Sequence, residues 1–179
     1  MAVDAVGIVL AAGAGTRYGS PKVLAKSGAW LHKAVHSLLA GGCDDVLVVL
    51  GAAHAPMPDG ARAVHAPDWA SGMSASLKAG LSAAGDAEFA VMHVVDTPDV
   101  GSEVVQAVLD GARSAPSRLA RAVYSGLPGH PVVFGREHWD EIRASSTGDS
   151  GARDFLRARN DVVTVECSLW ATGLDHDYR

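Results

Sequence analysis

Cysteine is scarce in this chain of 179 residues. The two cysteines, Cys43 and Cys167, stand far apart in the sequence and form no C-x-x-C pair. Disulfide frameworks and thiolate zinc sites both need closely spaced or more numerous cysteines, so neither is indicated. We therefore expect both thiols to be reduced and structural.

An excess of basic charge is also lacking. The chain has 15 Lys and Arg residues against 20 Asp and Glu residues, which gives a formal net charge of -5. Proteins that bind nucleic acids or acidic membranes need a basic face whose cations displace counterions. The charge balance argues against both of these partners, and it leaves room for a local positive patch that binds one small anion.

Long apolar runs are absent as well. The N-terminal apolar stretch is interrupted by Gly7 and has no basic segment in front of it. We therefore expect no signal peptide, no membrane span and a cytoplasmic protein. The composition, with 48% hydrophobic and 20% charged residues, is ordinary for a globular protein with one sizeable core. We expect a single domain over residues 1–179.

Glycine is concentrated near the N-terminus. Residues 6–22 read V-G-I-V-L-A-A-G-A-G-T-R-Y-G-S-P-K. The apolar run at 6–11 predicts a buried strand of the kind that helices cover on both faces. The turn after it lacks side chains at three positions, Gly13, Gly15 and Gly19. Backbone N–H groups can therefore approach an anion closely, and Arg17 and Lys22 add two positive charges, so this segment predicts a phosphate cradle.

Two other kinds of phosphate loop fit this segment less well. A dinucleotide-binding Rossmann turn needs an acidic residue at the end of the second strand to hold a ribose. The second expected strand, at 45–50, is followed by Gly51-Ala52-Ala53, so that acid is missing. A P-loop ends in Gly-Lys-Ser or Gly-Lys-Thr, and residues 19–22 read G-S-P-K.

Strand and helix patterns alternate along the rest of the chain. We expect strands at residues 45–50, 61–65, 89–95, 118–124, 131–134 and 162–165. We expect helices at about 30–40, 72–81 and 102–112, and a last helix that opens at 148–153. Residues 125–130 are rich in glycine and proline and predict a turn-rich connection. This alternation predicts an α/β fold.

Acidic residues follow the expected strand at 89–95. Asp96 would reach the same edge of a parallel sheet as the glycine-rich turn, because the carboxyl ends of parallel strands meet there. A carboxylate at this place suits magnesium bound to the phosphates of a nucleotide, since magnesium prefers hard oxygen ligands. We expect Asp99 to cap the helix at 102–112. His93, inside the strand, is expected to be a hydrogen-bonded core histidine.

The segment L-A-A-G-A-G-T-R-Y-G-S-P-K at 10–22 resembles the signature loop of the MobA-like NTP transferases. The resemblance implies an α/β three-layer αβα sandwich with a Rossmann-like, mostly parallel sheet of the nucleotide-diphospho-sugar transferase type. It also implies that the loop wraps the triphosphate of an NTP and that Arg17 and Lys22 contact the phosphates. The nucleotide-binding residues implied in this loop are Leu10, Ala11, Ala12, Gly13, Ala14 and Gly15.

Within this family the chain most resembles the molybdenum cofactor cytidylyltransferases. Residues 67–81, P-D-W-A-S-G-M-S-A-S-L-K-A-G-L, are similar to a block of those enzymes that lies beside the bound nucleotide. This likeness adds Gly72 and Ser76 to the implied nucleotide contacts. An alternative interpretation is a helix that begins with small residues for packing and capping alone.

Two further blocks resemble the acceptor side of those enzymes. P-G-H-P-V-V-F at 128–134 is similar to a region that faces the acceptor pterin, which makes His130 a candidate contact. G-D-S-G-A-R at 148–153 is similar to a second block and makes Asp149 and Arg153 candidates. A tight turn explains the first block equally well, and Asp149 could instead be an N-cap.

The implied cofactor is Mg²⁺. The family's Gly-Asp-x-Pro motif matches Asp96 and Pro98, with Val95 in the place of the glycine. The tail at 173–178, G-L-D-H-D-Y, is similar to the family's terminal D-x-D-T-P-E-D motif, although Thr-Pro-Glu is absent. The resemblance makes Asp96 the first metal ligand and Asp175 the second.

The resemblance implies a nucleotidyltransferase that transfers a nucleoside monophosphate from an NTP to a phosphorylated acceptor and releases pyrophosphate. The family's cytidylyl members typically have L-A-A-G here and its guanylyl members L-A-G-G, so the resemblance makes Ala12 an indication of CTP. A Cβ at this position narrows the base pocket, which suits a pyrimidine. The closest likeness implies molybdopterin as the acceptor and a molybdoenzyme or its chaperone as a further partner. A sugar-phosphate nucleotidylyltransferase and a non-catalytic nucleotide-binding protein of the same fold remain open as alternatives.

Overall fold

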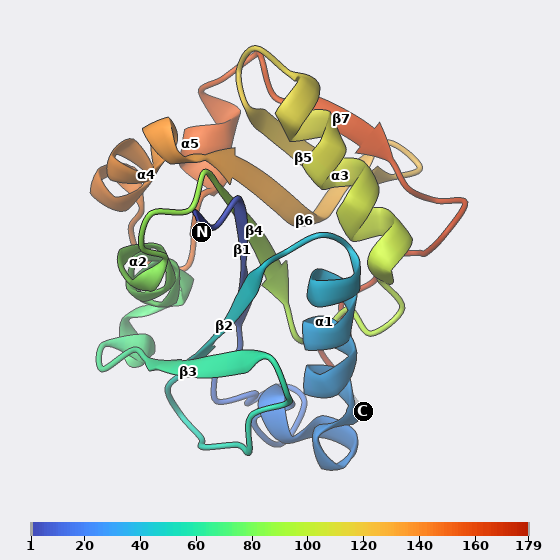
Figure 1. The fold of residues 1–179 in the computed structure, drawn as a ribbon. Coiled ribbons are helices and arrows are strands. Elements are labelled where there is room, and N and C mark those ends of the chain that lie inside the picture. Colours follow the sequence, from blue (N-terminus) through green and yellow to red (C-terminus); the bar gives the residue numbers. More distant parts are fainter. Residues whose placement is uncertain (1, 179) are drawn as a thin grey trace.

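Apolar, β-branched runs form the centre of a seven-stranded sheet in the computed structural model, which describes residues 2–178 (Figure 1). The strand order is β3-β2-β1-β4-β6-β5-β7. The two central strands, β1 (Ala5–Leu10) and β4 (Phe89–Val94), are buried along their whole length. Every residue of such a strand is buried because helices cover both faces of the sheet.

The sheet is mostly parallel. The remaining strands are β2 (Asp45–Leu50), β3 (Ala61–His65), β5 (Leu119–Tyr124), β6 (Leu127–Gly135) and β7 (Val163–Glu166). Strand β6 alone among the described strands runs antiparallel to its neighbours, β4 and β5. It reverses because Ser125 and Gly126 both have positive φ angles, 52° and 78°, as a two-residue hairpin turn requires.

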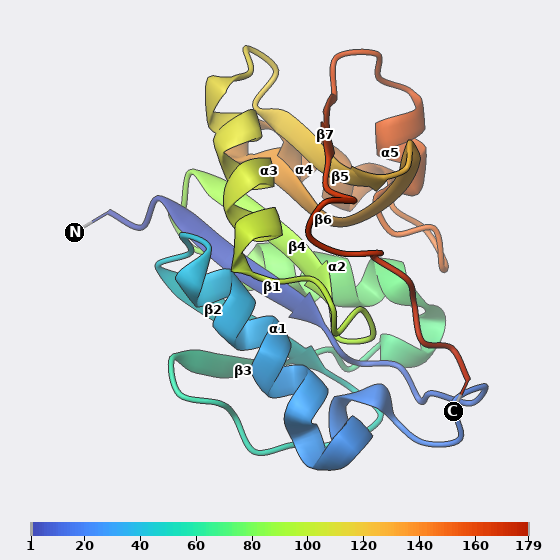
Figure 2. The same cartoon turned by 90° about the vertical axis from the view of Figure 1, so that its right-hand side faces the viewer.

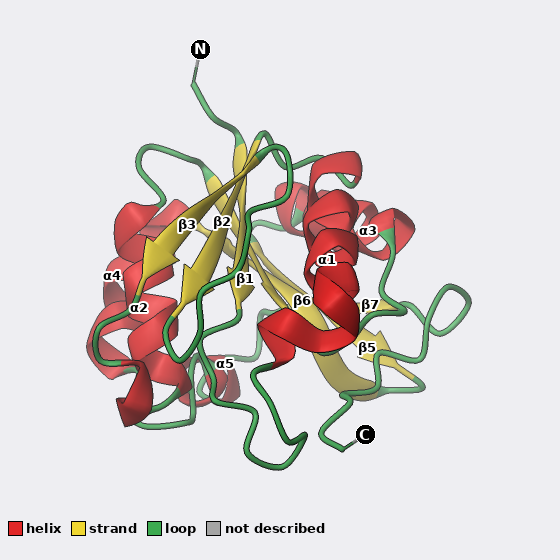
Figure 3. Cartoon of the chain, turned by 90° about the horizontal axis from the view of Figure 1, so that it is seen from below, coloured by secondary structure: helices red, strands yellow, loops and turns green. Residues whose placement is uncertain are grey.

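Helices cover both faces of the sheet (Figure 3). The α-helices are α1 (Ala29–Ala40), α2 (Met73–Ala83), α3 (Ser102–Ser114), α4 (Trp139–Ser145) and α5 (Arg153–Arg157). Three short 3₁₀ segments are η1 (Lys22–Gly28), η2 (Trp69–Ser71) and η3 (Arg136–His138). Helices α1 and α3 lie on one face, and α2, α4 and α5 lie on the other, so the expected three-layer αβα sandwich is confirmed.

Two glycines let helices approach the central strand closely. A Cβ at Gly80 of α2 would lie 2.6 Å from the Cγ2 atom of Ile8, and a Cβ at Gly7 of β1 would lie 2.8 Å from Leu38 of α1. Both distances are shorter than a van der Waals contact. Ile8 and Leu38 are fully buried, so each lies in one of the two cores that flank the sheet.

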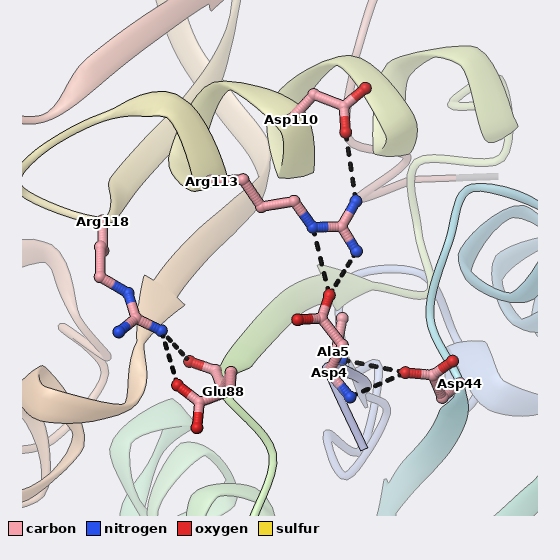
Figure 4. A network of polar contacts seen from close by, with 7 residues as sticks. All are labelled: Asp4, Ala5, Asp44, Glu88, Asp110, Arg113 and Arg118. Carbon is pink, nitrogen blue, oxygen red and sulfur yellow. Dashed lines mark hydrogen bonds and ion pairs between the residues drawn. The ribbon is translucent and has the colours of Figure 1, made fainter. Parts of the chain in front are cut away.

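Charged side chains hold the amino edge of the sheet, opposite the glycine-rich turn (Figure 4). Asp44 accepts hydrogen bonds from the backbone N–H groups of Asp4, at 2.9 Å, and of the next residue, at 3.2 Å. Arg113 of α3 donates to Asp4, and Arg118 donates to Glu88 at 2.9 Å. These contacts fix where β1 and β4 begin, and they leave the carboxyl edge free for a ligand.

Several local expectations were wrong. The turn predicted at 125–130 is shorter, because β6 already begins at Leu127. Asp99 does not cap α3, whose N-cap residue is Gly101 without a side-chain cap. Instead the carboxylate of Asp99 accepts hydrogen bonds from the backbone N–H group of Thr172, at 2.7 Å, and from its hydroxyl, at 2.6 Å. A tertiary contact with the tail therefore replaces the local cap.

The expectations for Asp149 and His93 also need correction. Asp149 does not cap α5; its Oδ1 atom accepts a hydrogen bond at 3.3 Å from the N–H group of Met73, the first residue of α2. His93 is a core residue as expected, at 1% exposure, but its Nδ1 atom has no hydrogen-bond partner among the described residues. Helix α4 and the 3₁₀ segments were not predicted. No helix within residues 2–178 combines the length and apolarity needed to cross a membrane.

Candidate functional site

The site forms where β1 and β4 end. These two strands are adjacent and parallel, so the segments that follow them emerge side by side at the carboxyl edge of the sheet. A cavity of about 540 Å³ opens between these segments. Its lining includes Leu10, Ala11, Gly13, Gly15, Arg17, Lys22, Asp96, Asp149 and Arg153, all of which were predicted site residues.

The glycine-rich turn has a backbone that side chains would disrupt. Gly15 and Gly19 have φ angles of 64° and 100°, and the N–H group of Gly19 donates to the carbonyl of Gly15 at 2.8 Å. A Cβ at Gly15 would lie 1.9 Å from the carbonyl oxygen of Ser20, so only glycine fits. A Cβ at Gly13 would meet nothing within 4 Å. Its missing side chain therefore leaves space on the ligand side of the turn.

The Lys22 ammonium group lies between two carboxylates. Its Nζ atom is 2.6 Å from Oδ2 of Asp96 and 2.9 Å from Oδ1 of Asp177. Burial by itself would lower the pKa of Lys22, but the hydrogen bonds and charges of these two aspartates raise it above its ordinary value. Arg17 adds a second, more exposed ion pair with Asp177, at 3.5 Å. Two cations and two carboxylates therefore meet at the mouth of the cavity.

Asp177 comes from the C-terminal tail, which passes over the carboxyl edge and ends beside the glycine-rich turn (Figure 2). The backbone N–H group of His176 donates to the carbonyl of Asp96 at 3.0 Å. The ring of His176 also packs on Trp30, with ring centroids 5.3 Å apart. Hydrogen bonding to Lys22 lowers the pKa of Asp177.

Sequence reasoning chose Asp175 in this tail and did not single out Asp177. The available signal was the D-x-D spacing, which offers both aspartates and does not distinguish them. Asp175 is exposed. Partial desolvation, together with the negative charges of Asp96 and Asp177, raises the pKa of Asp175. The ion pairs with Lys22 and Arg17 are made by Asp177.

A second cavity of about 300 Å³ adjoins the first. The two cavities share Leu10, Gly13, Met73 and Asp149. The second is lined in addition by Ala12, Ala14, Trp69, Gly72 and Ser76, so the structure brings the predicted nucleotide contacts of α2 next to the turn after β1. A Cβ at Gly72 would lie 2.5 Å from Oδ1 of Asp149, so the close approach of these two segments needs this glycine.

His130 lines neither of these two cavities. It is half-buried near the start of β6, and its carbonyl accepts a hydrogen bond from the Tyr124 hydroxyl at 2.6 Å. Burial lowers the pKa of His130 to about 4; the charge of Asp96 opposes this shift and the charge of Arg121 adds to it. The imidazole is therefore neutral near pH 7, and it lies within electrostatic range of Asp96.

The two carboxylates suit a divalent cation whose remaining ligands are phosphate and water. Asp96 and Asp177 direct one oxygen each at a single cationic atom, Nζ of Lys22. No group of three or more His, Cys, Asp or Glu side chains arranged for a metal occurs within residues 2–178. Magnesium and manganese accept such sites, because one or two carboxylates are often their only protein ligands and phosphate and water complete the shell. These residues therefore fit the implied metal.

Comparison with known proteins finds a family model and several solved structures that match this chain. The sequence model of the MobA-like NTP transferase domain matches residues 7–163. Among curated proteins, the chain is similar to the nicotine blue oxidoreductase of Paenarthrobacter nicotinovorans, with 36% identity over 96% of this chain and 91% of that protein.

Solved structures have the same fold. The Rv0371c protein of Mycobacterium tuberculosis superimposes with a TM-score of 0.76 at 24% identity, over 93% of this chain and 89% of that chain. It has also been solved in complex with manganese, with a TM-score of 0.69, 21% identity and the same coverage. A nucleotidyl transferase from Methanothermobacter thermautotroptrophicus superimposes with a TM-score of 0.75 at 22% identity, over 92% and 88% of the two chains. At these identities the likeness shows the fold alone.

Proposed function

Because the chain belongs to the MobA-like NTP transferase family, we propose that it transfers a nucleoside monophosphate, preferably CMP, from an NTP to a phosphorylated acceptor and releases pyrophosphate. Molybdopterin is the acceptor we would test first. The observation that carries the proposal is the meeting of Lys22 and Asp96 at 2.6 Å, across 74 residues of sequence, at the mouth of a glycine-lined cavity.

The cradle supplies charge and positioning for this reaction. An oxygen of the acceptor phosphate attacks the α-phosphorus of the NTP, and the bond from that phosphorus to the pyrophosphate oxygen breaks. No enzyme nucleophile is needed, so the protein contributes alignment and neutralisation of charge. Lys22, Arg17 and the open N–H groups around Gly13 lie where the triphosphate of a nucleotide in this cavity would rest. They would stabilise the negative charge that grows on the leaving pyrophosphate.

Asp96 and Asp177 are the residues that would hold the metal, preferably Mg²⁺. When bound, such an ion polarises the phosphoryl oxygens and neutralises their charge. With the two carboxylates holding the ion, the Lys22 ammonium group would be free to contact the phosphates. The manganese complex of the M. tuberculosis protein supports a divalent cation in proteins of this fold.

The base would occupy the smaller cavity. Its volume of about 300 Å³ and the Cβ of Ala12 support a pyrimidine over a purine. Ser76 is buried at this cavity, at 5% exposure, and its hydroxyl is a hydrogen-bonding group on the helix that lines the pocket.

The test is pyrophosphate release by the wild type and two variants, Lys22→Met and Asp96→Asn. Each NTP is supplied separately with magnesium and molybdopterin. Loss of one such charged donor typically costs about 3 kcal/mol of transition-state stabilisation, so Lys22→Met should lower kcat/KM about 100-fold. Asp96→Asn should nearly abolish turnover with the fold intact by circular dichroism. Wild-type rates in both variants would refute the proposal.

A second function is favoured by the curated relative. Nicotine blue oxidoreductase is 36% identical over nearly the whole chain, and its name describes an oxidoreductase that acts on nicotine blue. The same cradle would then hold the pyrophosphate of a reduced nicotinamide dinucleotide, with an oxidised aromatic acceptor beside it. The adjoining cavities of about 540 and 300 Å³ offer room for two nucleotide halves.

One pair of assays separates the two functions. The protein is incubated with NADH or NADPH and an oxidised aromatic dye, and the loss of the reduced nicotinamide absorbance is followed. In parallel it is incubated with each NTP and molybdopterin, and pyrophosphate is measured. Oxidation of the nicotinamide without pyrophosphate release in any combination would replace the transferase proposal with the reductase.

A further inference from the structure

Arg121 is a half-buried arginine without a counter-charge. Among the arginines within residues 2–178, only three lie farther than 4.0 Å from every carboxylate: Arg121, Arg153 and Arg157. Arg153 and Arg157 are exposed, whereas Arg121 is partly buried. Its Nε atom is buried and has no hydrogen-bond partner among the described residues. Burial lowers the pKa of this guanidinium. A lowered pKa is expected for a buried cation that has no anion beside it.

The sheet directs Arg121 toward the face of the molecule that carries α5. Arg121 lies opposite Val132 in the β5–β6 ladder. Val132 is buried in the core under α4 and α5, as is Leu119, two residues before Arg121. Because side chains alternate along a strand and opposite residues share a face, the Arg121 side chain projects to the same face. Helix α5 begins on this face with Arg153, which lines the large cavity.

The same strands bring Arg121 near Asp96 and His130. Val132 also pairs with Met92 of β4, so His130, two residues earlier in the antiparallel β6, comes level with the end of β4. The charges of Asp96 and Arg121 both act on the His130 ring, so both groups lie within electrostatic range of it. The ladder therefore places a further cation, Arg121, in a strand beside the end of β6, and this cation does not line the cavity that Lys22 and Asp96 line.

We propose that Arg121, with His130 on the neighbouring strand, forms an oxyanion subsite that binds the phosphate of the acceptor. The subsite rests on the proposed function for the identity of its ligand, although not for its ability to bind phosphate. A guanidinium presents paired N–H donors that match two oxygens of one phosphate. An acceptor phosphate held there would bind outside the cavity proposed for the triphosphate, because Arg121 does not line that cavity. Its attacking oxygen would approach the α-phosphorus from the side opposite to the leaving group.

The alternative is that Arg121 has a purely structural role, but it lacks the contacts that structural arginines usually make. The described arginines that pack over aromatic rings are Arg118 on Phe89 and Arg159 on Phe155, and Arg121 is not one of them. A structural arginine in a partly buried position is normally paired with a carboxylate or bonded to carbonyl groups. Arg121 has neither within the described part of the chain, so its guanidinium is available to pair with an external anion.

The test is a titration of the full chain with inorganic phosphate, without metal or nucleotide, followed by amide chemical shifts. Two groups of amides report independently: residues 13–19 of the cradle, and residues 119–132 of the β5–β6 hairpin. In the wild type we expect the hairpin amides to shift and saturate. Arg121→Met should weaken phosphate binding at the hairpin at least tenfold and leave the cradle response unchanged.

Two further variants make the result specific. Arg157→Met removes an unpaired but exposed arginine and should leave both responses at wild-type values. Arg121→Lys keeps the charge and loses the paired donors, so it should bind phosphate at the hairpin several-fold more weakly than the wild type, even if Arg121→Met folds poorly. A hairpin that does not respond in the wild type, or responds equally in Arg121→Met, would overturn the subsite.

Turnover gives a second measurement. With the acceptor that supports pyrophosphate release, Arg121→Met should raise the KM for the acceptor and leave the KM for the NTP unchanged. The opposite pattern would overturn the assignment. Failure of the proposed function is a different result: pyrophosphate is never released, while the phosphate titration of the hairpin still succeeds.

Discussion

At the scale of single residues, the central feature is that Lys22 already forms ion pairs with two carboxylates. Its two partners, Asp96 and Asp177, are 18% and 34% exposed at their side chains, so the cluster lies at the boundary of solvent rather than in the core. Ion pairs at such positions exchange readily for other ions, because water screens part of their attraction. A metal triphosphate can therefore replace the Lys22 contacts with its own.

Asp177→Asn tests this exchange. Without metal, the variant should bind NTP more tightly than the wild type, because Asp177 no longer competes with the phosphates for Lys22 and Arg17. With magnesium, turnover should fall at least tenfold, because one metal carboxylate is lost. Calorimetric titration and pyrophosphate release measure the two effects. The matched control is Asp175→Asn, two residues away, which should change neither by more than about twofold; equal effects in both variants would contradict the role of Asp177.

At the scale of elements, the position of the tail depends on its fit to the β5–β6 hairpin. The ring of Tyr124 lies against two glycines, and a Cβ at Gly173 would come within 2.2 Å of it. The Tyr124 hydroxyl in turn holds the carbonyl of His130. The tail, the hairpin and the residues of the site are therefore mechanically linked through one aromatic ring.

Gly173→Ala should break this link, and Gly85→Ala is its matched control. Both glycines have nearly the same φ angle, 64° and 65°, but a Cβ at Gly85 would meet nothing within 4 Å. The left-handed backbone alone should cost about 1–2 kcal/mol in each variant. Gly173→Ala should lose more stability than this and expose the tail to proteolysis. Equal urea midpoints and equal cleavage rates would show that the ring does not hold the tail.

At the scale of the whole molecule, buried histidines should set the response to acid. Burial lowers the pKa of His93 to about 3, with a smaller contribution from the charge of His130, and lowers the pKa of His130 to about 4. An unfolded histidine titrates near 6.5. Between these values the unfolded chain binds protons that the folded chain does not, so stability falls as the pH falls below about 6.5.

The variant His93→Gln isolates this effect. At pH 5 the His93 contribution to the loss of stability is about 2 kcal/mol, since one pKa unit corresponds to ~1.4 kcal/mol. The difference in unfolding free energy between pH 7 and pH 5, measured by urea denaturation, should therefore shrink by about this amount in the variant. His32→Gln, at an exposed position of α1, serves as the control and should behave as the wild type. An unchanged pH dependence in His93→Gln would contradict the prediction.

The fold was predictable from the sequence to the extent that it depends on local patterns. The residue limits of β2 and β3 were predicted correctly, and those of α1 and α3 were right to within a few residues. Periodicity and turn chemistry act over a few residues, so a single sequence contains them. Helix α4 was missed because its seven residues are too short for a clear helical repeat.

The candidate site was predictable only in part. The turn after β1 and the aspartate after β4 could be placed on one edge, because parallel neighbouring strands force their carboxyl ends together. The pairing of Asp99 with Thr172 and of Asp149 with Met73 could not be predicted, because a local cap and a distant donor compete for the same carboxylate. In both cases the packing of distant segments brought a backbone N–H group from another part of the chain to the carboxylate.

By itself, then, the sequence determined the alternation of strands and helices and the chemistry of the phosphate cradle, because both arise from residues that are neighbours along the chain. Only the tertiary structure decided which tail aspartate meets Lys22, 155 residues away, and left Arg121 without an anion beside the site. Such contacts are fixed by how the layers pack, and packing depends on the whole set of buried side chains rather than on any one segment.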